Sequence, residues 1–169
     1  MSSVSPSPPE AASGDTARVR RRTTNTIKES LRALSIQLSL LNHQVGAQLE
    51  LKDVDFDCYD LISRHGPLSP TALARRAGLH PATMTGVLDR LERGGWISRE
   101  RDPADRRAVV IRGQRDRHAE VYRLYSGMNG RMDELCQGYD ETQLELIADF
   151  LSRVTEAGRV ATDDLSGAS

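Results

Sequence analysis

Arginine and threonine side chains gather in two short segments in the middle of the sequence. Arg106 and Arg107 stand side by side in a turn sequence that begins at Asp102, and Thr83 and Thr85 follow a His-Pro pair upstream. A guanidinium group matches the geometry of phosphate oxygens and base edges. Threonine can donate to a base edge and place its methyl group against thymine. A helix in the major groove beside a cationic hairpin is one known arrangement for binding duplex DNA.

Two short helices are predicted to carry the threonine segment. Ser69-Pro70 opens the first helix with a capping hydroxyl and a proline at the first helical position, and Gly78 can end it. The second helix begins at His80-Pro81 and ends at the glycine pair 94–95. Its buried stripe is predicted to contain Val87, Leu88 and Leu91.

Two strands, over 96–101 and 108–112, are expected to present the arginine turn. Charge supports this placement: between Arg64 and Arg117 there are 12 arginines against 6 Asp and Glu, whereas the whole chain has a net charge of −1. Arginine-rich composition alone would also fit a GC-rich coding genome, but that would not explain the clustering.

Long amphipathic helices are predicted on both sides of this module. Thr26 and Glu29 have the spacing of a capping box, as do Asp140 and Gln143. Apolar residues at helical spacing follow each of these two predicted helix starts, and a third apolar stripe precedes Asp140. One chain of this size cannot easily cover all of these stripes, so we expect them to pair with those of a second copy.

Composition excludes several functional classes. The chain has two cysteines without metal-ligand spacing and no apolar run of about 20 residues, so we expect a cytoplasmic protein without a membrane span. We expect no cofactor and no enzymatic activity, because glycine-rich phosphate loops, nucleophile elbows and paired-histidine metal motifs are absent. Four scattered histidines leave zinc sensing as an open alternative to the expectation of no metal.

In these motifs the sequence resembles the MarR family of bacterial transcriptional regulators. The resemblance rests on GPLSPTALARRAGL at 66–79, T-x-T at 83–85 with LDRLE at 88–92, GWI at 95–97 and RDPADRRAVV at 101–110. It implies a mainly α, winged helix-turn-helix fold in the order α-α-α-α-β-β-α-α, with long dimerisation helices at both ends. We expect a disordered tail (1–15), an N-terminal dimerisation helix (16–52), the DNA-binding module (53–112), C-terminal dimerisation helices (113–162) and a frayed tail (163–169).

The resemblance implies a homodimer that binds double-stranded DNA at a pseudo-palindromic operator, most often as a repressor on the nucleoid. Base edges would be read by Ala82, Thr83, Thr85 and Gly86, although many relatives carry a long polar or basic side chain at the position of Gly86. Arg107 would enter the minor groove, braced by Asp105. Backbone phosphates would be contacted by Ser69, Thr71, Arg75, His80, Arg90 and Arg106, each of which could alternatively serve local structure.

A small phenolic or other anionic effector would release the DNA, by the same resemblance. Its site would lie between the long helices and the DNA-binding module, with His43, Phe56, Tyr59 and His65 as candidates. Two alternatives stay open: a regulator of the same fold that senses cysteine oxidation, and a winged-helix module that binds proteins instead of DNA. Cys58 is expected inside a helix as an inert thiol, which disfavours the first alternative.

Overall fold

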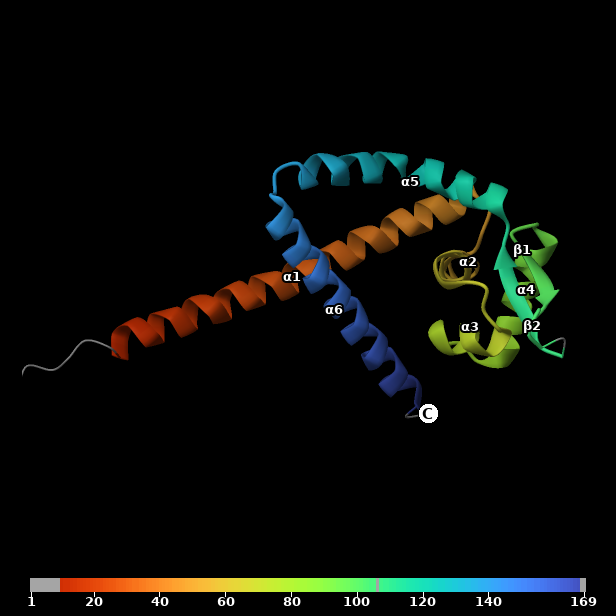
Figure 1. Ribbon diagram of the computed structural model, residues 1–169, viewed down its shortest axis with the longest axis horizontal. Helices are drawn as coiled ribbons and strands as arrows, with labels where there is room; N and C mark the ends of the chain where they lie inside the picture. Colours follow the sequence, from red (N-terminus) through yellow and green to blue (C-terminus); the bar gives the residue numbers. More distant parts are fainter. Residues whose placement is uncertain (1–9, 106, 168–169) are drawn as a thin grey trace, which may run out of the picture. The chain divides into compact units, whose positions relative to one another are not determined.

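A computed structural model describes residues 10–105 and 107–167 of the chain (Figure 1). The order of its elements is the predicted one. They are α1 (Glu10–Gln48), α2 (Asp53–His65), α3 (Pro70–Arg76), α4 (Pro81–Arg93), β1 (Ile97–Arg101), β2 (Val109–Gly113), α5 (Arg115–Cys136) and α6 (Glu141–Gly167). The chain forms two units, residues 1–44 and residues 45–169.

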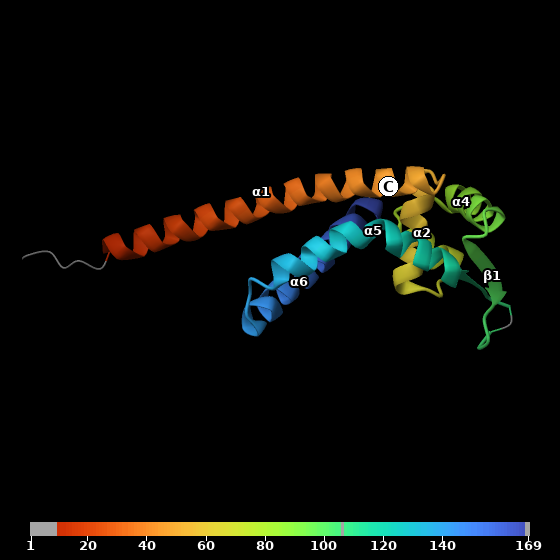
Figure 2. The ribbon, with the colours of Figure 1, turned by 90° about the horizontal axis from the view of Figure 1, so that it is seen from above.

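The long terminal helices extend further than the sequence pattern indicated. Figure 2 shows α1 as one continuous helix, which begins at Glu10 rather than at residue 16. Ala11 and Ala12 favour helix, and adding residues to an existing helix is much easier than nucleating one. Residues 10–15 of the expected tail are therefore helical, and residues 1–9 lie outside the described residues. At the other end, α6 continues to Gly167, past the predicted start of a frayed tail at 163.

Helix starts were predicted with mixed success. Asp140 and Gln143 form the expected capping box: the amide of Gln143 donates to Asp140 Oδ1 and the amide of Asp140 donates to Gln143 Oε1. Thr26 does not cap a helix, because α1 already runs through it and its hydroxyl donates to the carbonyl of Arg22 instead. A hydroxyl within a helix readily bonds back to the preceding turn.

The core of the second unit lies among α2, α3, α4 and the hairpin. The predicted stripe of α4 is buried, with Val87, Leu88 and Leu91 no more than 2% exposed. Trp96, at the base of the hairpin, is 4% exposed and packs edge-on against Tyr59 of α2, with ring centroids 5.1 Å apart. Trp96 is therefore a core residue.

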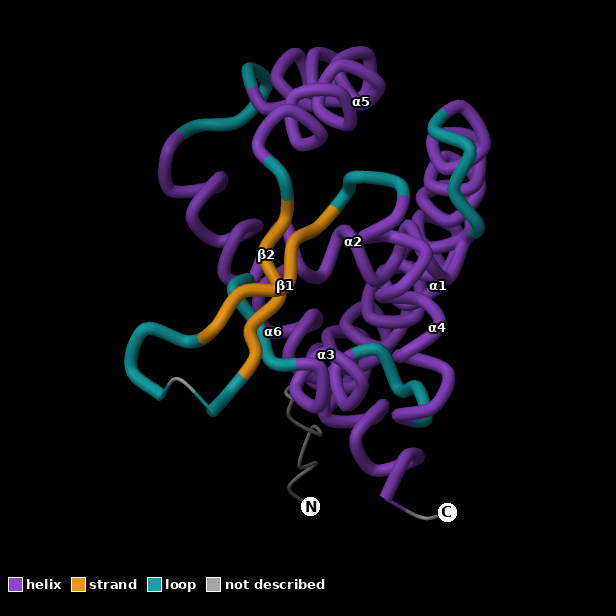
Figure 3. Tube along the Cα trace, turned by 90° about the vertical axis from the view of Figure 1, so that its right-hand side faces the viewer, coloured by secondary structure: helices purple, strands orange, loops and turns teal. Residues whose placement is uncertain are grey.

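The hairpin is a two-stranded antiparallel sheet, and Figure 3 shows the strands side by side with the turn that joins them. Its register pairs Ile97 with Gly113 and Arg101 with Val109. An isolated bridge joins Leu68 to Ile111. That bridge ties the hairpin to the segment preceding α3, so the arginine turn projects from a fixed base.

An ion pair connects α4 to the start of α2. Asp55 is the one charged residue that is buried within the described part of the chain. Its carboxylate accepts from Arg90 Nε at 2.8 Å and from Arg90 Nη2 at 2.6 Å. Burial of a carboxylate is unfavourable unless it is paired, so this two-point contact fixes the position of α4 along its axis.

We predict unequal costs for removing the two partners. Arg90→Ala leaves a buried carboxylate unpaired and should lower the free energy of unfolding by about 3 kcal/mol. Asp55→Ala should cost less, because the Arg90 side chain is 37% exposed and water can solvate it. Urea unfolding at one protein concentration measures both.

The matched control is Arg112→Ala, since Arg112 pairs with Glu100 where both side chains are more than 40% exposed. It should change stability by less than about 1 kcal/mol. If Arg90→Ala costs no more than this control, the anchoring role of the buried pair is wrong.

Candidate nucleic-acid interface

The first turns of α4 present a small exposed surface opposite the buried stripe. Ala82, Thr83 and Thr85 are exposed and Gly86 is half-buried, whereas Met84 between them is 1% exposed. The Thr85 hydroxyl donates to the carbonyl of Pro81, so its oxygen can still accept a hydrogen bond from a base edge. The four predicted base-reading positions thus lie together at the start of one helix.

His80 has a local role that sequence reasoning assigned to other residue types. Its Nδ1 accepts a hydrogen bond from the amide of Ala82 at 3.2 Å, so His80 caps α4. An imidazole nitrogen that carries no proton can accept from the same amide as a capping hydroxyl. A phosphate contact from the exposed side of its ring stays a prediction.

The start of α3 is capped as the sequence predicted. Ser69 Oγ accepts from the amide of Ala72 at 3.2 Å, and Pro70 follows at the first helical position. Thr71, Arg75 and Arg76 are exposed on this helix. The predicted phosphate-contacting residues of α3 are therefore accessible, but their contact with DNA stays a prediction.

Two aspartates organise the backbone of the arginine turn. Asp105 Oδ1 accepts from the amide of Arg107 at 3.0 Å, and Asp102 Oδ1 accepts from the amide of Ala104 at 2.8 Å. Asp105 thus supports Arg107 through its main chain, which leaves the side chain of Arg107 exposed at the tip. Arg106 lies outside the described residues.

Arg90 binds a buried carboxylate. Both Nε and Nη2 of its guanidinium bind the Asp55 carboxylate, and this contact raises the pKa of Arg90. No sequence pattern indicated the pairing, because the two residues are far apart in the chain. The structure therefore gives Arg90 a role as an anchor of α4, and a phosphate contact from its half-exposed side chain stays a prediction.

Three of the four predicted effector residues belong to the second unit and have different surroundings. Phe56 is 1% exposed in the core. His65 lines a separate hollow that includes Arg75, Arg76 and Arg159. Tyr59 lines the cavity between α2 and α5, whereas His43 belongs to the first unit, and a role for these residues in effector binding stays a prediction.

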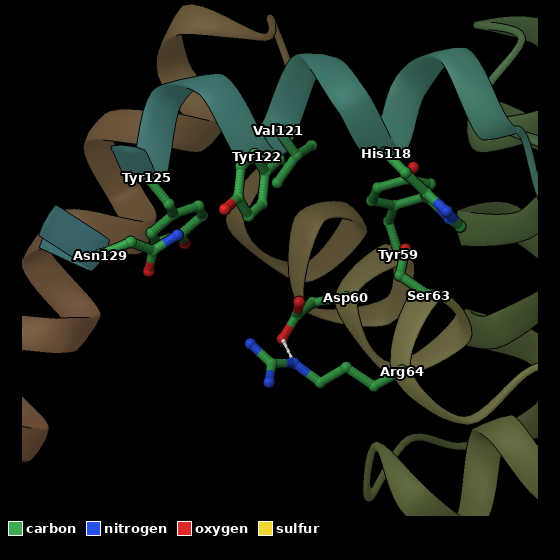
Figure 4. Close-up of a pocket in the computed structure, with 9 residues that line it drawn as sticks. All are labelled: Tyr59, Asp60, Ser63, Arg64, His118, Val121, Tyr122, Tyr125 and Asn129. Atoms are coloured by element: carbon green, nitrogen blue, oxygen red, sulfur yellow. Dashed lines mark hydrogen bonds and ion pairs between the residues drawn. The ribbon is translucent and has the colours of Figure 1, made fainter. Parts of the chain in front are cut away.

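That cavity has a volume of about 340 Å³. Figure 4 shows aromatic and apolar side chains of α5 facing polar side chains of α2. The lining residues are Tyr59, Asp60, Ser63, Arg64, His118, Val121, Tyr122, Tyr125 and Asn129. The α5 residues have a sequence signal that we missed: 118, 122, 125 and 129 repeat at intervals of four, three and four, which places them on one helical face.

The polar groups of the cavity include three buried atoms without a hydrogen bond of acceptable geometry. They are the hydroxyls of Tyr59 and Ser63 and Nε2 of His118. Burial raises the pKa of Tyr59 and its contact with the Ser63 hydroxyl lowers it, so these two groups interact with each other. A concave cavity lined by aromatic and polar side chains has the character of a binding site. Its one guanidinium, that of Arg64, is already paired with Asp60 at 2.8 Å.

Cys58 lacks the properties of a redox sensor. Its side chain is fully buried, and burial together with the nearby Asp57 and Asp55 carboxylates raises its pKa to about 11. At neutral pH only about one such thiol in 10⁴ is ionised, and the thiolate is the reactive form. The structure supports the prediction of an inert thiol at this position.

The described residues also bear on metal binding and on membrane insertion. Among the described residues, no group of three His, Cys, Asp or Glu side chains could hold a metal ion. The described helices include none that is long and apolar enough to cross a membrane.

The winged arrangement has relatives among known proteins. Residues 51–109 match the family model described as MarR family. YcgE of Bacillus subtilis, described as an HTH-type transcriptional regulator, is 31% identical over 141 residues, which cover 79% of this chain and 92% of that protein. The HTH-type transcriptional repressor YetL of the same organism is 29% identical over 96 residues, or 57% of this chain and 58% of YetL.

A solved structure has the same fold. It is a MepR variant from S. aureus bound to an oligodeoxyribonucleotide, with 19% identity, a TM-score of 0.52, and coverage of 78% of this chain and 96% of that one. These likenesses agree with the geometry of α3, α4 and the hairpin, and the relatives are regulators rather than enzymes. The chain therefore belongs to the MarR family of transcriptional regulators.

Proposed function

We propose that this protein is a homodimeric repressor that binds a pseudo-palindromic operator and is released by a phenolic effector. The observation that carries the proposal is the pairing of an exposed α4 surface with an arginine-tipped hairpin on one fixed base. Ala82, Thr83 and Thr85 would read base edges in the major groove, and Arg107 would enter the adjacent minor groove. YetL, a relative named as a repressor, supports repression rather than activation of transcription.

Exposed apolar side chains on the long helices support the homodimer. On α6, Leu146 is 69% and Phe150 is 39% exposed, and on α5, Leu135 is 63% exposed. In α1, Ile36 and Leu40 are each 55% exposed. Apolar patches of this extent usually mark an interface. A two-fold dimer would also place two copies of α4 about 34 Å apart, one turn of duplex DNA.

The cavity between α2 and α5 supports a phenolic rather than an anionic effector. Its lining combines hydroxyl groups, a carboxamide and aromatic rings, which suit a neutral ligand that both donates and accepts. Arg64 is neutralised by Asp60, whose carboxylate would also repel an anion. Tyr59 and Tyr125 offer aromatic surface to a planar ring.

Fluorescence anisotropy tests the central claim with the full chain, a duplex from the intergenic region upstream of its own gene and a scrambled duplex. We expect about 10³-fold tighter binding to the upstream duplex. Affinity should fall steeply as salt increases, because phosphate contacts release counterions. Equal binding to both duplexes would rule out this operator, and no binding at low salt would favour the protein-binding alternative.

Arg107 should make the largest single contribution from the hairpin. Arg107→Ala should weaken operator binding by about 1–3 kcal/mol and reduce the preference for A·T-rich flanks, because a narrow minor groove concentrates negative potential. Arg123→Ala, which removes the same charge from an exposed position on α5, is the matched control and should have little effect. Equal effects of the two variants would contradict the minor-groove role.

The dimer is tested by adding charge to α6. The double variant Leu146→Glu, Phe150→Glu should shift the protein from dimer to monomer in analytical ultracentrifugation, because an interface cannot bury two unpaired carboxylates. Gln143→Glu, Ser152→Glu adds the same charge at polar positions of the helix and should remain a dimer. A dimer in both variants would show that this face of α6 is not the interface.

A further inference from the structure

The first turn of α5 contacts the end of the candidate recognition helix through one side chain. Arg117 Nη2 donates to the carbonyl of Gly94 at 3.1 Å, and Nη1 pairs with Glu120 at 2.8 Å. The centre of the guanidinium lies 4.4 Å from the centroid of the Trp96 ring. Arg117 therefore binds the carbonyl of the residue that ends α4, although it belongs to another helix.

This contact has a clear physical role. Carbonyl groups at a helix C-terminus carry partial negative charge and lack partners within the helix, so a cation that donates to one of them stabilises the helix end. The surroundings are tightly packed: a Cβ at Gly94 would lie 2.8 Å from Trp96 Cδ1. A displacement of Arg117 would therefore remove a partner from α4 and uncover one face of Trp96.

His118, the neighbour of Arg117, lines the cavity. Its ring lies 5.7 Å from that of Tyr59, and its Nε2 is one of the three unpaired atoms. A Cβ at Gly113 would lie 2.5 Å from that nitrogen, so the Nε2 edge of the ring lies against the end of β2. A cavity occupant that pushes against His118 must move the first turn of α5, because the ring has no room to retreat.

We propose that Arg117 is a positioning residue that transmits occupancy of the α2–α5 cavity to the C-terminal end of α4. An occupant that displaces His118 shifts the first turn of α5, Arg117 leaves the carbonyl of Gly94, and α4 loses its support on that side. The inference rests on the proposed function, since it assumes that α4 reads DNA and that the cavity regulates it. The Asp55–Arg90 pair is a second anchor of α4, and neither of its residues lines the α2–α5 cavity.

A double-mutant cycle tests the relay without a known effector. Ser63→Phe fills the cavity and mimics an occupant, and Val121→Phe is a second filling variant in case the first fails to fold. Each is combined with Arg117→Gln and, as the matched control, with Arg123→Gln, which removes an exposed arginine further along α5. Thermal melts confirm that every variant is folded at the assay temperature.

Operator affinity is the first readout. Filling the cavity should weaken binding about tenfold when Arg117 is present and less than about twofold in the Arg117→Gln background, with the tenfold loss retained beside Arg123→Gln. In the Arg117→Lys background, filling the cavity should weaken operator binding by a factor between these two values. An ammonium can lie over Trp96 but cannot form the forked contacts of a guanidinium. The same tenfold loss with and without Arg117 would overturn the relay, and so would filling variants that bind DNA normally.

Quenching of Trp96 by acrylamide is the second readout and needs no DNA. Trp96 is the one tryptophan of the chain, so its emission reports on this junction alone. Filling the cavity should increase quenching when Arg117 is present and leave it unchanged in Arg117→Gln. The unmodified protein could bind no operator while cavity filling still increases Trp96 quenching only when Arg117 is present. That result would contradict the proposed function but support the coupling of the cavity to α4 through Arg117. Unchanged quenching in all variants overturns the link itself.

Discussion

The buried carboxylate of Asp55 is the constraint on which the DNA-binding module depends. A charge that is almost inaccessible to water must be paired, and the two-point contact with Arg90 satisfies it. Because Arg90 lies on α4 and Asp55 lies in the first turn of α2, the pair fixes one helix against the other. The exposed surface of α4 and the hairpin that follows it are positioned by this contact and by the packing of Trp96.

A second constraint comes from apolar surface that the described chain leaves exposed. The long helices α1, α5 and α6 each carry apolar side chains that contact water, which is unfavourable for a protein that acts alone. The same helices include α5, whose first turn lies between the cavity and the end of α4. In the proposed dimer, a change in α5 would therefore affect both the spacing of the reading helices and the support of each one.

Local patterns predicted most of the fold. The order of elements, the capped start of α3, the buried stripe of α4 and the capping box at Asp140 follow from interactions between residues a few positions apart. The same patterns misplaced the ends of α1 and α6, because helix propagation depends on weak preferences summed over many residues.

The sequence by itself determined the class of this protein, because the winged helix-turn-helix motifs and the cluster of arginines are local properties of the chain. Only the tertiary structure decided the roles of individual side chains. Arg90 became an anchor, Arg117 a cap for another helix, and Tyr59 and His118 walls of one cavity. Each of these roles depends on residues distant in sequence that folding brings within hydrogen-bonding or packing distance, and no periodicity or spacing encodes such contacts.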